Sequence, residues 1–315
     1  MENFNINPRI QTDLYGYDDV FLEITDLYDK KKLPNKILFT GNGGIGKATL
    51  SYHLINYILS KNESYHYDLK NFKINKMNKS YKLVSNYSHP NFFLIDLLED
   101  KKFIEIFQIR EMINYTNKSS FNSNEKIILI DNVEKLNLNS INALLKIVEE
   151  PSDNTFFILV FDSNQKTLDT LQSRCVKYNL SLSHKNIIEI TNKLIGNDVK
   201  ILLNNDLINY YNTPGDFLKL IKFATENHIN IYDQNLKNFI IKLIENNNYK
   251  KNLFIKENIY KFIEYYYLNM VKLNKYKFNF ISTYSNLIKN ISNIKKYNLD
   301  EESLFIEVKS KLLNG

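Results

Sequence analysis

The 315-residue sequence has very little cysteine and no long apolar segment. A single cysteine, Cys175, cannot form an intramolecular disulfide, and no CxxC pair is present that would bind zinc. No run approaches the ~18–20 apolar residues that a membrane-spanning helix needs. The first residues carry neither the basic flank nor the apolar core of a signal peptide. We therefore expect neither secretion nor membrane insertion, and no structural zinc.

The net charge is +6 and the pI is about 8.9, so the chain is moderately basic. A nucleic acid or another acidic partner is one explanation of this charge. An equally good explanation is compositional, because Lys, Asn, Ile and Tyr are all abundant. The charge alone therefore does not decide between a nucleic-acid-binding function and another function.

A phosphate-binding loop is predicted between an apolar run, Ile37 to Thr40, and a helical pattern over residues 50–61. Residues 41–47 complete the pattern GxxxxGK. Glycines allow the backbone amides of such a loop to point inward, and the following helix adds partial positive charge. The predicted phosphate ligands are the backbone at Gly41, Gly44 and Gly46, together with Lys47, whose ammonium would reach the β- and γ-phosphates.

The position after the lysine is unusual, because it holds Ala48 where a Ser or Thr hydroxyl normally binds magnesium. Thr49 lies one residue later, and one helical step rotates a side chain by about 100°. We include Thr49 among the candidate nucleotide ligands, but as a poor substitute for the missing hydroxyl. The loop is suited to a nucleotide and poorly suited to metal-assisted hydrolysis.

A second nucleotide-site element is predicted at residues 127–131, an apolar strand that ends in Asp131. An aspartate at this place binds the magnesium shell in P-loop proteins. The next residue, where an active ATPase carries glutamate, is Asn132, whose neutral amide cannot act as a general base. Glu134 follows too late in the sequence to fill that role.

Apolar strands alternate with helices as far as about residue 182, which predicts a parallel sheet covered on both faces. The strands are expected at 37–40, 92–95, 126–130, 155–160 and 175–178, with helices at about 20–31, 50–61, 139–149 and 167–173 and one marked by Ile106, Ile109 and Ile113. The polar stretch 61–88 is interpreted as a surface insertion. Helical periodicity then continues to Leu313, with only 229–232 ambiguous. We predict three domains: 1–182, a helical domain at 183–235 and a helical C-terminal domain at 236–315.

Two further motifs indicate a family. Residues 142–151 read NALLKIVEEP, and Ser173, Arg174 and Cys175 follow. In this order, after the two nucleotide-site elements, they resemble the bacterial clamp-loader subunits of DNA polymerase III, within the AAA+ ATPases. The segments 44–50, 33–34, 89–91 and 106–111 resemble the delta-prime subunits more than the gamma/tau motor subunits. The resemblance covers roughly residues 7–220, and it implies an α/β AAA+ P-loop domain, a small helical lid and an all-helical collar.

The resemblance also implies a role. In the family, Arg174 would be an arginine finger that reaches the nucleotide of a neighbouring subunit. The partners would be gamma/tau motor subunits and a delta subunit in a hetero-pentamer, with the sliding clamp and primed DNA contacted through the complex, in the cytoplasm at the replisome. The chain would belong to the DNA polymerase holoenzyme without a polymerase site of its own. ATP would bind weakly or not at all, with little intrinsic hydrolysis.

Departures from the motor pattern support a subunit that does not hydrolyse ATP. The four zinc-binding cysteines that motor subunits carry between the two nucleotide-site elements are absent. Asp162 stands where the family has a sensor threonine, and Asp216 stands near the place of an expected phosphate-binding arginine. Together with Ala48 and Asn132, four motor features are altered. Two alternatives stay open: an active AAA+ ATPase, such as a gamma-like motor or a helicase loader, and an adaptor that keeps the fold without using nucleotide.

Overall fold

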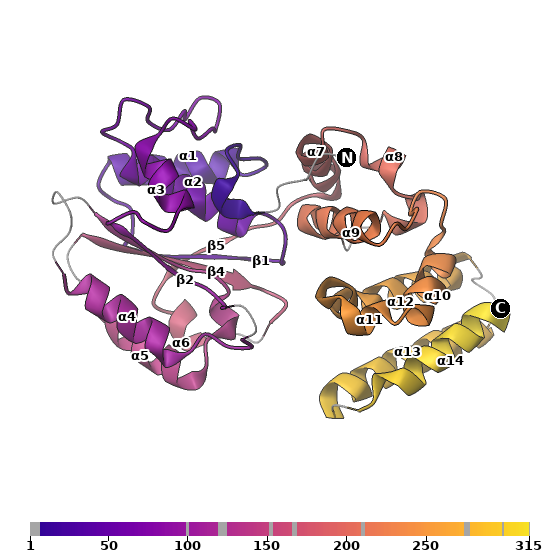
Figure 1. Cartoon of the computed structure of the whole chain (residues 1–315). Helices are drawn as coiled ribbons and strands as arrows, with labels where there is room; N and C mark the ends of the chain where they lie inside the picture. Colours follow the sequence, from indigo (N-terminus) through magenta and orange to yellow (C-terminus); the bar gives the residue numbers. More distant parts are fainter. Residues whose placement is uncertain are drawn as a thin grey trace. The chain divides into compact units, whose positions relative to one another are not determined.

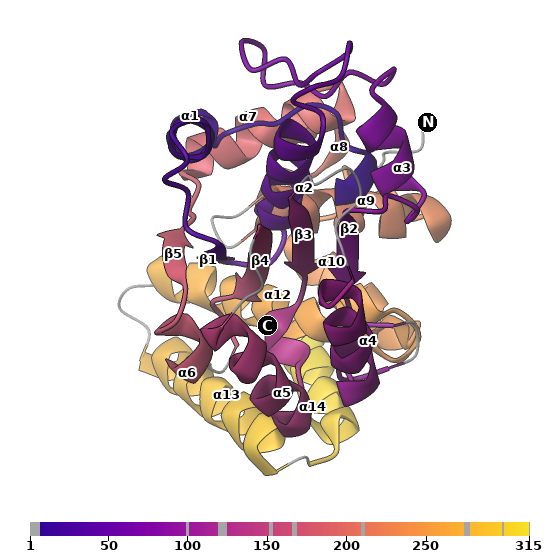
Figure 2. The same cartoon turned by 90° about the vertical axis from the view of Figure 1, so that its left-hand side faces the viewer.

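The computed structural model describes residues 7–98, 101–118, 125–150, 154–165, 169–208, 212–273, 278–297 and 299–314. The chain divides into two compact units, which are drawn in Figures 1 and 2 and are described separately below. The first unit comprises Met1–Thr191 with Thr213–Gly215, and the second comprises Asn192–Asn212 with Asp216–Gly315.

The first unit is built on a five-stranded sheet in which every neighbouring pair is parallel. The strand order is β2-β3-β4-β1-β5, which can be followed across Figure 2. The strands are β1 (Lys36–Gly41), β2 (Phe92–Ile95), β3 (Lys126–Ile130), β4 (Thr155–Asp162) and β5 (Val176–Asn179). The predicted parallel sheet is confirmed, and β2 and β3 have the predicted bounds.

Helices cover both faces of this sheet, as the alternation of strands and helices predicts (Figure 1). One face carries α1, α2 and α3, and the opposite face carries α4, α5 and α6. The helices of the unit are α1 (Asp18–Asp29), α2 (Lys47–Leu59), α3 (Lys79–Ser85), α4 (Ile106–Thr116), α5 (Leu138–Glu149), α6 (Asp169–Gln172) and α7 (His184–Ile195, which continues into the second unit), with short 3₁₀ helices η1 (Pro8–Ile10) and η3 (Val133–Lys135). Pro151, the last residue of the motif at 142–151, and residues 167–168 of the predicted short helix lie outside the described residues.

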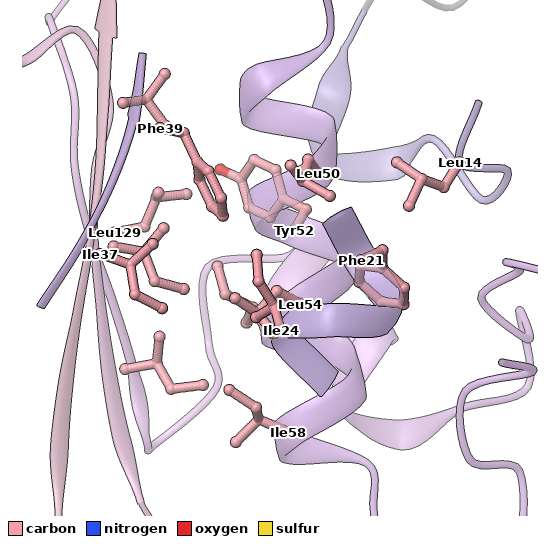
Figure 3. Packing of buried hydrophobic residues seen from close by; sticks show 14 of the residues in the cluster. Leu14, Phe21, Ile24, Ile37, Phe39, Leu50, Tyr52, Leu54, Ile58 and Leu129 are labelled. Carbon is pink, nitrogen blue, oxygen red and sulfur yellow. The ribbon is translucent and has the colours of Figure 1, made fainter. Parts of the chain in front are cut away.

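Alternate residues of the central strands enter two separate cores. In β1, Ile37 and Phe39 pack against α1 and α2, whereas Leu38 belongs to the core on the α4 and α5 side. Figure 3 shows the first of these cores, with Leu50 and Leu54 of α2 facing the sheet. Because a parallel sheet buries both faces, its strands read as continuous apolar runs, and this is why the sequence located them.

The segment at residues 61–88 is more than the surface insertion that its polar composition suggested. Tyr67, Ile74 and Val84 are each buried and join the core above α1 and α2. The backbone N–H of Ile74 donates to the carbonyl of Thr12 at 2.8 Å, so the segment is attached to the residues that precede α1. The interpretation as a purely superficial insertion is corrected: a few apolar residues, widely spaced among polar ones, are enough to anchor it.

The described part of the second unit is helical. Its elements are α8 (Val199–Leu202), η4 (Asn205–Leu207), α9 (Pro214–Glu226, which begins in the first unit), α10 (Leu236–Glu245), α11 (Asn248–Lys251), α12 (Leu253–Leu273), α13 (Phe278–Tyr297) and α14 (Glu301–Asn314). Helix α12 packs on α10, α11 and α13. Residues 229–232, ambiguous in the sequence, form no strand. The division into domains at 182 and 235 stays a prediction.

Within the residues placed by the structure, none of the helices combines the length and the apolar character needed to cross a membrane.

Candidate functional site

The predicted phosphate loop joins β1 to α2, as the sequence indicated. Gly46 is the N-cap residue of α2 and has a left-handed backbone, with φ of 96°. Gly44 is also left-handed, with φ of 78°, and a Cβ built there would lie 2.4 Å from Oγ1 of Thr213. A side chain at Gly44 is therefore excluded both by the backbone conformation and by the space available. The loop has the strand–turn–helix setting that phosphate binding requires.

Lys47 is buried, and its ammonium is held by the loop itself. Nζ donates hydrogen bonds of 2.7 Å to the carbonyl oxygens of Gly41 and Asn42. Burial lowers the pKa of Lys47, while the carboxylates of Asp162, Asp131 and Glu134 act in the opposite direction. The ammonium group predicted to meet phosphate thus lies at the loop, with the carboxylates of Asp131, Glu134 and Asp162 near enough to act on it.

Asp131 lies at the carboxyl end of β3, on the same edge of the sheet as the loop. Burial, with a smaller contribution from the nearby carboxylate of Asp96, raises the pKa of Asp131 to about 7. The backbone N–H of Asn132 donates to Oδ1 of Asp131 at 2.9 Å and partly offsets this shift. Burial and Asp96 thus favour the protonated form of Asp131 over the carboxylate.

Asn132, at the position of the usual catalytic glutamate, is turned to another partner. Its backbone is left-handed, with φ of 54°, and Nδ2 donates to Oδ1 of Asp96 at 2.7 Å. Glu134, the next available acid, accepts the backbone N–H of Asp162 through Oε2 at 3.1 Å. Burial raises the pKa of Glu134. At the position of the usual general base the chain thus has a neutral amide, which cannot activate water, and the next acid in the sequence, Glu134, is already engaged by β4.

Asp162 ends β4 and lies beside the loop. A Cβ built at Gly43 would lie 3.2 Å from Oδ2 of Asp162, so this carboxylate is in close contact with the loop backbone. Ser163 follows, and its hydroxyl donates to Oδ1 of Asn42 at 3.2 Å. A bound triphosphate would meet the negative charge of Asp162 where a sensor threonine would offer a hydroxyl.

Two further contacts at the loop were not anticipated from the sequence. The hydroxyl of Tyr17 donates to the carbonyl of Ile45 at 2.9 Å, across 28 positions of sequence. The backbone N–H of Gly215 donates to the carbonyl of Gly44 at 2.9 Å. Thr213 and Gly215 therefore lie against the loop. Asp216 belongs to the second unit, and its effect on phosphate stays a prediction.

Arg174 lies near the amino-terminal ends of the strands, whereas the phosphate loop lies at their carboxyl ends. It precedes β5 by two residues, and Val176 of β5 is in register with Ile37 at the start of β1. The loop follows the other end of β1, where Leu180 donates its N–H to the carbonyl of Thr40 at 2.7 Å. Leu180 follows Arg174 by six residues, which corresponds to about 20 Å of extended chain at ~3.3 Å per residue. An arginine side chain cannot span this distance, so Arg174 is not part of the site around Lys47.

The guanidinium of Arg174 is held by two other elements. Nε donates to Oε1 of Glu149 at 2.8 Å, Nη2 lies 2.6 Å from the same oxygen, and Nη1 donates to the carbonyl of Thr170 at 2.6 Å. Burial raises the pKa of the neighbouring Cys175 thiol to about 11, so this group is protonated and unreactive at neutral pH. Cys175 is partly buried and packs against the core on the α4 and α5 side of the sheet.

The side chains at the loop fit magnesium–ATP only in part. Lys47 and the helix N-terminus suit a phosphate, but Ala48 offers no metal-binding oxygen and Thr49 is half-buried one step further along α2. In the parts of the chain that the structure describes, no group of three or more His, Cys, Asp and Glu could hold a metal ion.

Comparisons with known proteins agree with the motifs. The sequence model of the family described as DNA polymerase III, delta subunit, matches residues 18–184. The chain is 29% identical over 140 residues to the DNA polymerase III subunit delta-prime of Pseudomonas aeruginosa, covering 44% of this chain and 41% of that protein. It is 32% identical over 154 residues to the delta-prime subunit of Buchnera aphidicola, covering 46% of this chain and 44% of that protein.

A motor-type relative also matches. The DNA polymerase III subunit gamma of Buchnera aphidicola is 27% identical over 237 residues, covering 73% of this chain and 62% of that protein. The matches to the two delta-prime proteins span less than half of the length of each relative. The family model, which ends at residue 184, spans the phosphate loop and the sheet.

Proposed function

The chain belongs to the family of DNA polymerase III delta-prime subunits, and from this membership we propose that it is a clamp-loader subunit that hydrolyses little or no ATP. Its own contribution to catalysis is Arg174, which it donates to the ATP site of a neighbouring motor subunit. The assembly uses that ATP to load the sliding clamp onto primed DNA.

The observation that carries this proposal is the separation of Arg174 from the chain's own phosphate loop. The parallel pairing of β5 with β1 sets the two at opposite edges of the sheet. An arginine placed there has no access to a nucleotide bound at Lys47, whereas a neighbouring subunit can approach it. Its fixed charge and forked donors suit the negative charge that develops on a transferring phosphoryl group.

The chain's own loop supports the non-hydrolysing half of the proposal. Metal-assisted hydrolysis needs a hydroxyl at position 48, a general base after Asp131 and an electrostatic environment that favours the negatively charged phosphate. Ala48, Asn132 and Asp162 supply none of these. Nucleotide binding at Lys47 is weak or absent on this account, and zinc is not used.

The proposed setting follows from the family. The partners are gamma/tau motor subunits and a delta subunit in a hetero-pentamer, which contacts the clamp and primed DNA at the replisome in the cytoplasm. The chain is a member of the polymerase holoenzyme without polymerase activity of its own. In this assembly the helices after residue 183 serve as the lid and collar.

The test is ATP turnover of the reconstituted loader, stimulated by clamp and primed DNA, with wild-type chain and with Arg174→Ala. Arginine fingers contribute about 10³–10⁵ in rate, so turnover at the affected site should fall by about 10³-fold or more. Arg174→Lys keeps the charge but loses the fork, and it should recover little activity. Lys177→Ala, which removes a neighbouring exposed cation on β5, is the matched control and should have no effect.

A second candidate, a self-sufficient motor ATPase, is favoured by the complete GxxxxGK pattern, by Asp131 and by the match to a gamma subunit. The isolated chain separates the two functions. If it hydrolyses ATP on its own, the motor function replaces the one proposed. If it is silent and Arg174→Ala leaves loader turnover unchanged, the passive adaptor is the better account.

A further inference from the structure

Two motifs that are separate in the sequence meet in the structure. Glu149 of the first motif contacts Arg174 of the second, which follows it by 25 residues in the sequence. We propose that Glu149 is a positioning residue, which holds the Arg174 guanidinium in the orientation that a neighbouring subunit's phosphate requires. This inference rests on the proposed function, in which Arg174 acts on a nucleotide in trans.

The contacts fix the guanidinium and still leave it able to bind. Nε and Nη2 both face Oε1 of Glu149, at 2.8 and 2.6 Å, and Nη1 donates to the Thr170 carbonyl at 2.6 Å. Because Nη1 and Nη2 each carry two N–H groups, one N–H on each nitrogen remains for an outside acceptor. A phosphate oxygen pair can be bound by such a fork while Glu149 and Thr170 keep their contacts.

Helix stability does not explain a carboxylate at position 149. Glu149 is the last residue of α5, where the helix dipole disfavours negative charge. The ion pair itself stabilises the fold little, because the Arg174 side chain is 36% exposed and that of Glu149 is 51% exposed. What the pair does achieve is to hold a long, flexible side chain between α5 and α6, two helices that pack together.

This arrangement matters for the reaction because an arginine fixed beforehand needs no ordering when the transition state forms. Without Glu149, the guanidinium retains only the Thr170 carbonyl and samples several rotamers. The opposite role would be a latch, in which Glu149 competes with phosphate and slows the reaction until it is displaced. The two roles predict changes of opposite sign when Glu149 is removed.

The experiment measures kcat and KM for ATP in the reconstituted loader containing wild type, Glu149→Ala, Glu149→Gln, Arg174→Ala or the double variant Glu149→Ala/Arg174→Ala. We expect Glu149→Ala to lower kcat by about tenfold with KM little changed, since a misplaced catalytic group acts mainly on the transition state. Glu149→Gln keeps one acceptor oxygen and should lose less. The double variant should equal Arg174→Ala alone, because Glu149 acts only through Arg174. Glu150→Ala, the exposed neighbouring glutamate, is the matched control and should retain wild-type kcat.

The possible outcomes separate the two proposals. If Arg174→Ala lowers kcat but Glu149→Ala does not, or if the two losses multiply in the double variant, the positioning role is wrong while the finger stands. If Glu149→Ala raises kcat, Glu149 is a latch and the positioning role is equally overturned. If Arg174→Ala itself has no effect, the proposed function fails first. Should Glu149→Ala fail to fold, Glu149→Gln and the double variant Glu149→Gln/Arg174→Ala give the same comparison.

Discussion

The side-chain amide of Asn132 donates a 2.7 Å hydrogen bond to Oδ1 of Asp96 and so joins the carboxyl ends of two neighbouring strands, β3 and β2. The carboxylate of Asp96 is also close enough to Asp131 to raise the pKa of that group. An amide at position 132 can donate to Asp96, whereas a glutamate there would repel it. Asn132 therefore has two effects. It leaves the site without a general base, and it links the carboxyl ends of β2 and β3, where Asp96 and Asp131 lie close together.

The first prediction concerns stability against pH. Burial and Asp96 raise the pKa of Asp131 to about 7 in the folded chain, against about 3.9 for an unfolded aspartate. A group whose pKa is raised on folding stabilises most below the unfolded pKa, and this stability is lost as the pH rises through about 7. At pH 8, Asp131→Asn should therefore be more stable than wild type, by up to about 4 kcal/mol from a shift of about three units.

Urea unfolding at a series of pH values measures this difference. The curves of free energy against pH for wild type and Asp131→Asn should converge below about pH 3, where the aspartate is protonated in both the folded and the unfolded state, and this convergence is the internal control. Equal free energies of unfolding at pH 8 would contradict the assignment of a raised pKa to Asp131.

The second prediction concerns the missing magnesium ligand. Ala48→Thr introduces the hydroxyl, and Ala48→Val introduces the same shape without it. We expect the Thr variant, and not the Val variant, to bind a fluorescent ATP analogue more tightly when magnesium is present. Phosphate release should stay at background in both, because Asn132 cannot act as a general base. Strong hydrolysis by Ala48→Thr alone would refute the role assigned to Asn132.

A third prediction tests whether the chain's own loop is a working site. In the reconstituted loader, Lys47→Ala should leave ATP turnover within about twofold of wild type, because no catalytic step depends on this lysine. The corresponding substitution in the motor subunit is the positive control and should abolish turnover at its site. A large loss with Lys47→Ala, in a variant shown to be folded by urea unfolding, would mean that this loop turns over nucleotide.

The fourth prediction compares two glycines with similar backbones. Gly44 has φ of 78° and a Cβ there would lie 2.4 Å from Thr213 Oγ1, whereas Gly196 has φ of 68° and open space around it. Gly196→Ala should cost about 1 kcal/mol, for the backbone strain alone. Gly44→Ala should cost about 2–4 kcal/mol, because Thr213 must also move. Equal urea midpoints for the two variants would show that the turn at residues 213–215 does not pack on the loop.

Much of the sheet and the loop was predictable, and the reason is physical. All five residues of β3 are buried, and β2 is buried at its two ends and half-buried between them, so both strands read as apolar runs apart from Lys126 at the start of β3. The phosphate loop could be placed because glycine is needed where the backbone is left-handed, and this requirement is visible in the local sequence.

The contacts that shape the candidate site were not predictable in the same way. Tyr17 reaches Ile45 across 28 positions, and Glu149 reaches Arg174 across 25. Neither pair leaves a periodic pattern, because each depends on how separate elements pack. The segment 61–88 was misjudged for a related reason: its core residues Tyr67 and Ile74 are isolated among polar neighbours, so their burial shows only in three dimensions.

The parallel pairing of β5 with β1 gives the subunit a direction. Arg174 and the phosphate loop lie at opposite ends of the strands. When the arginine of one subunit contacts the loop of the next subunit in a row, the contact is therefore head-to-tail. Each internal member of the row must both give an arginine and receive one. A subunit that supplies an arginine, but whose own phosphate loop does not hydrolyse ATP, does not require an arginine from a neighbour at that loop. On the proposed function, therefore, this chain terminates the row, and the assembly stays an open arc of defined length instead of growing or closing into a uniform ring.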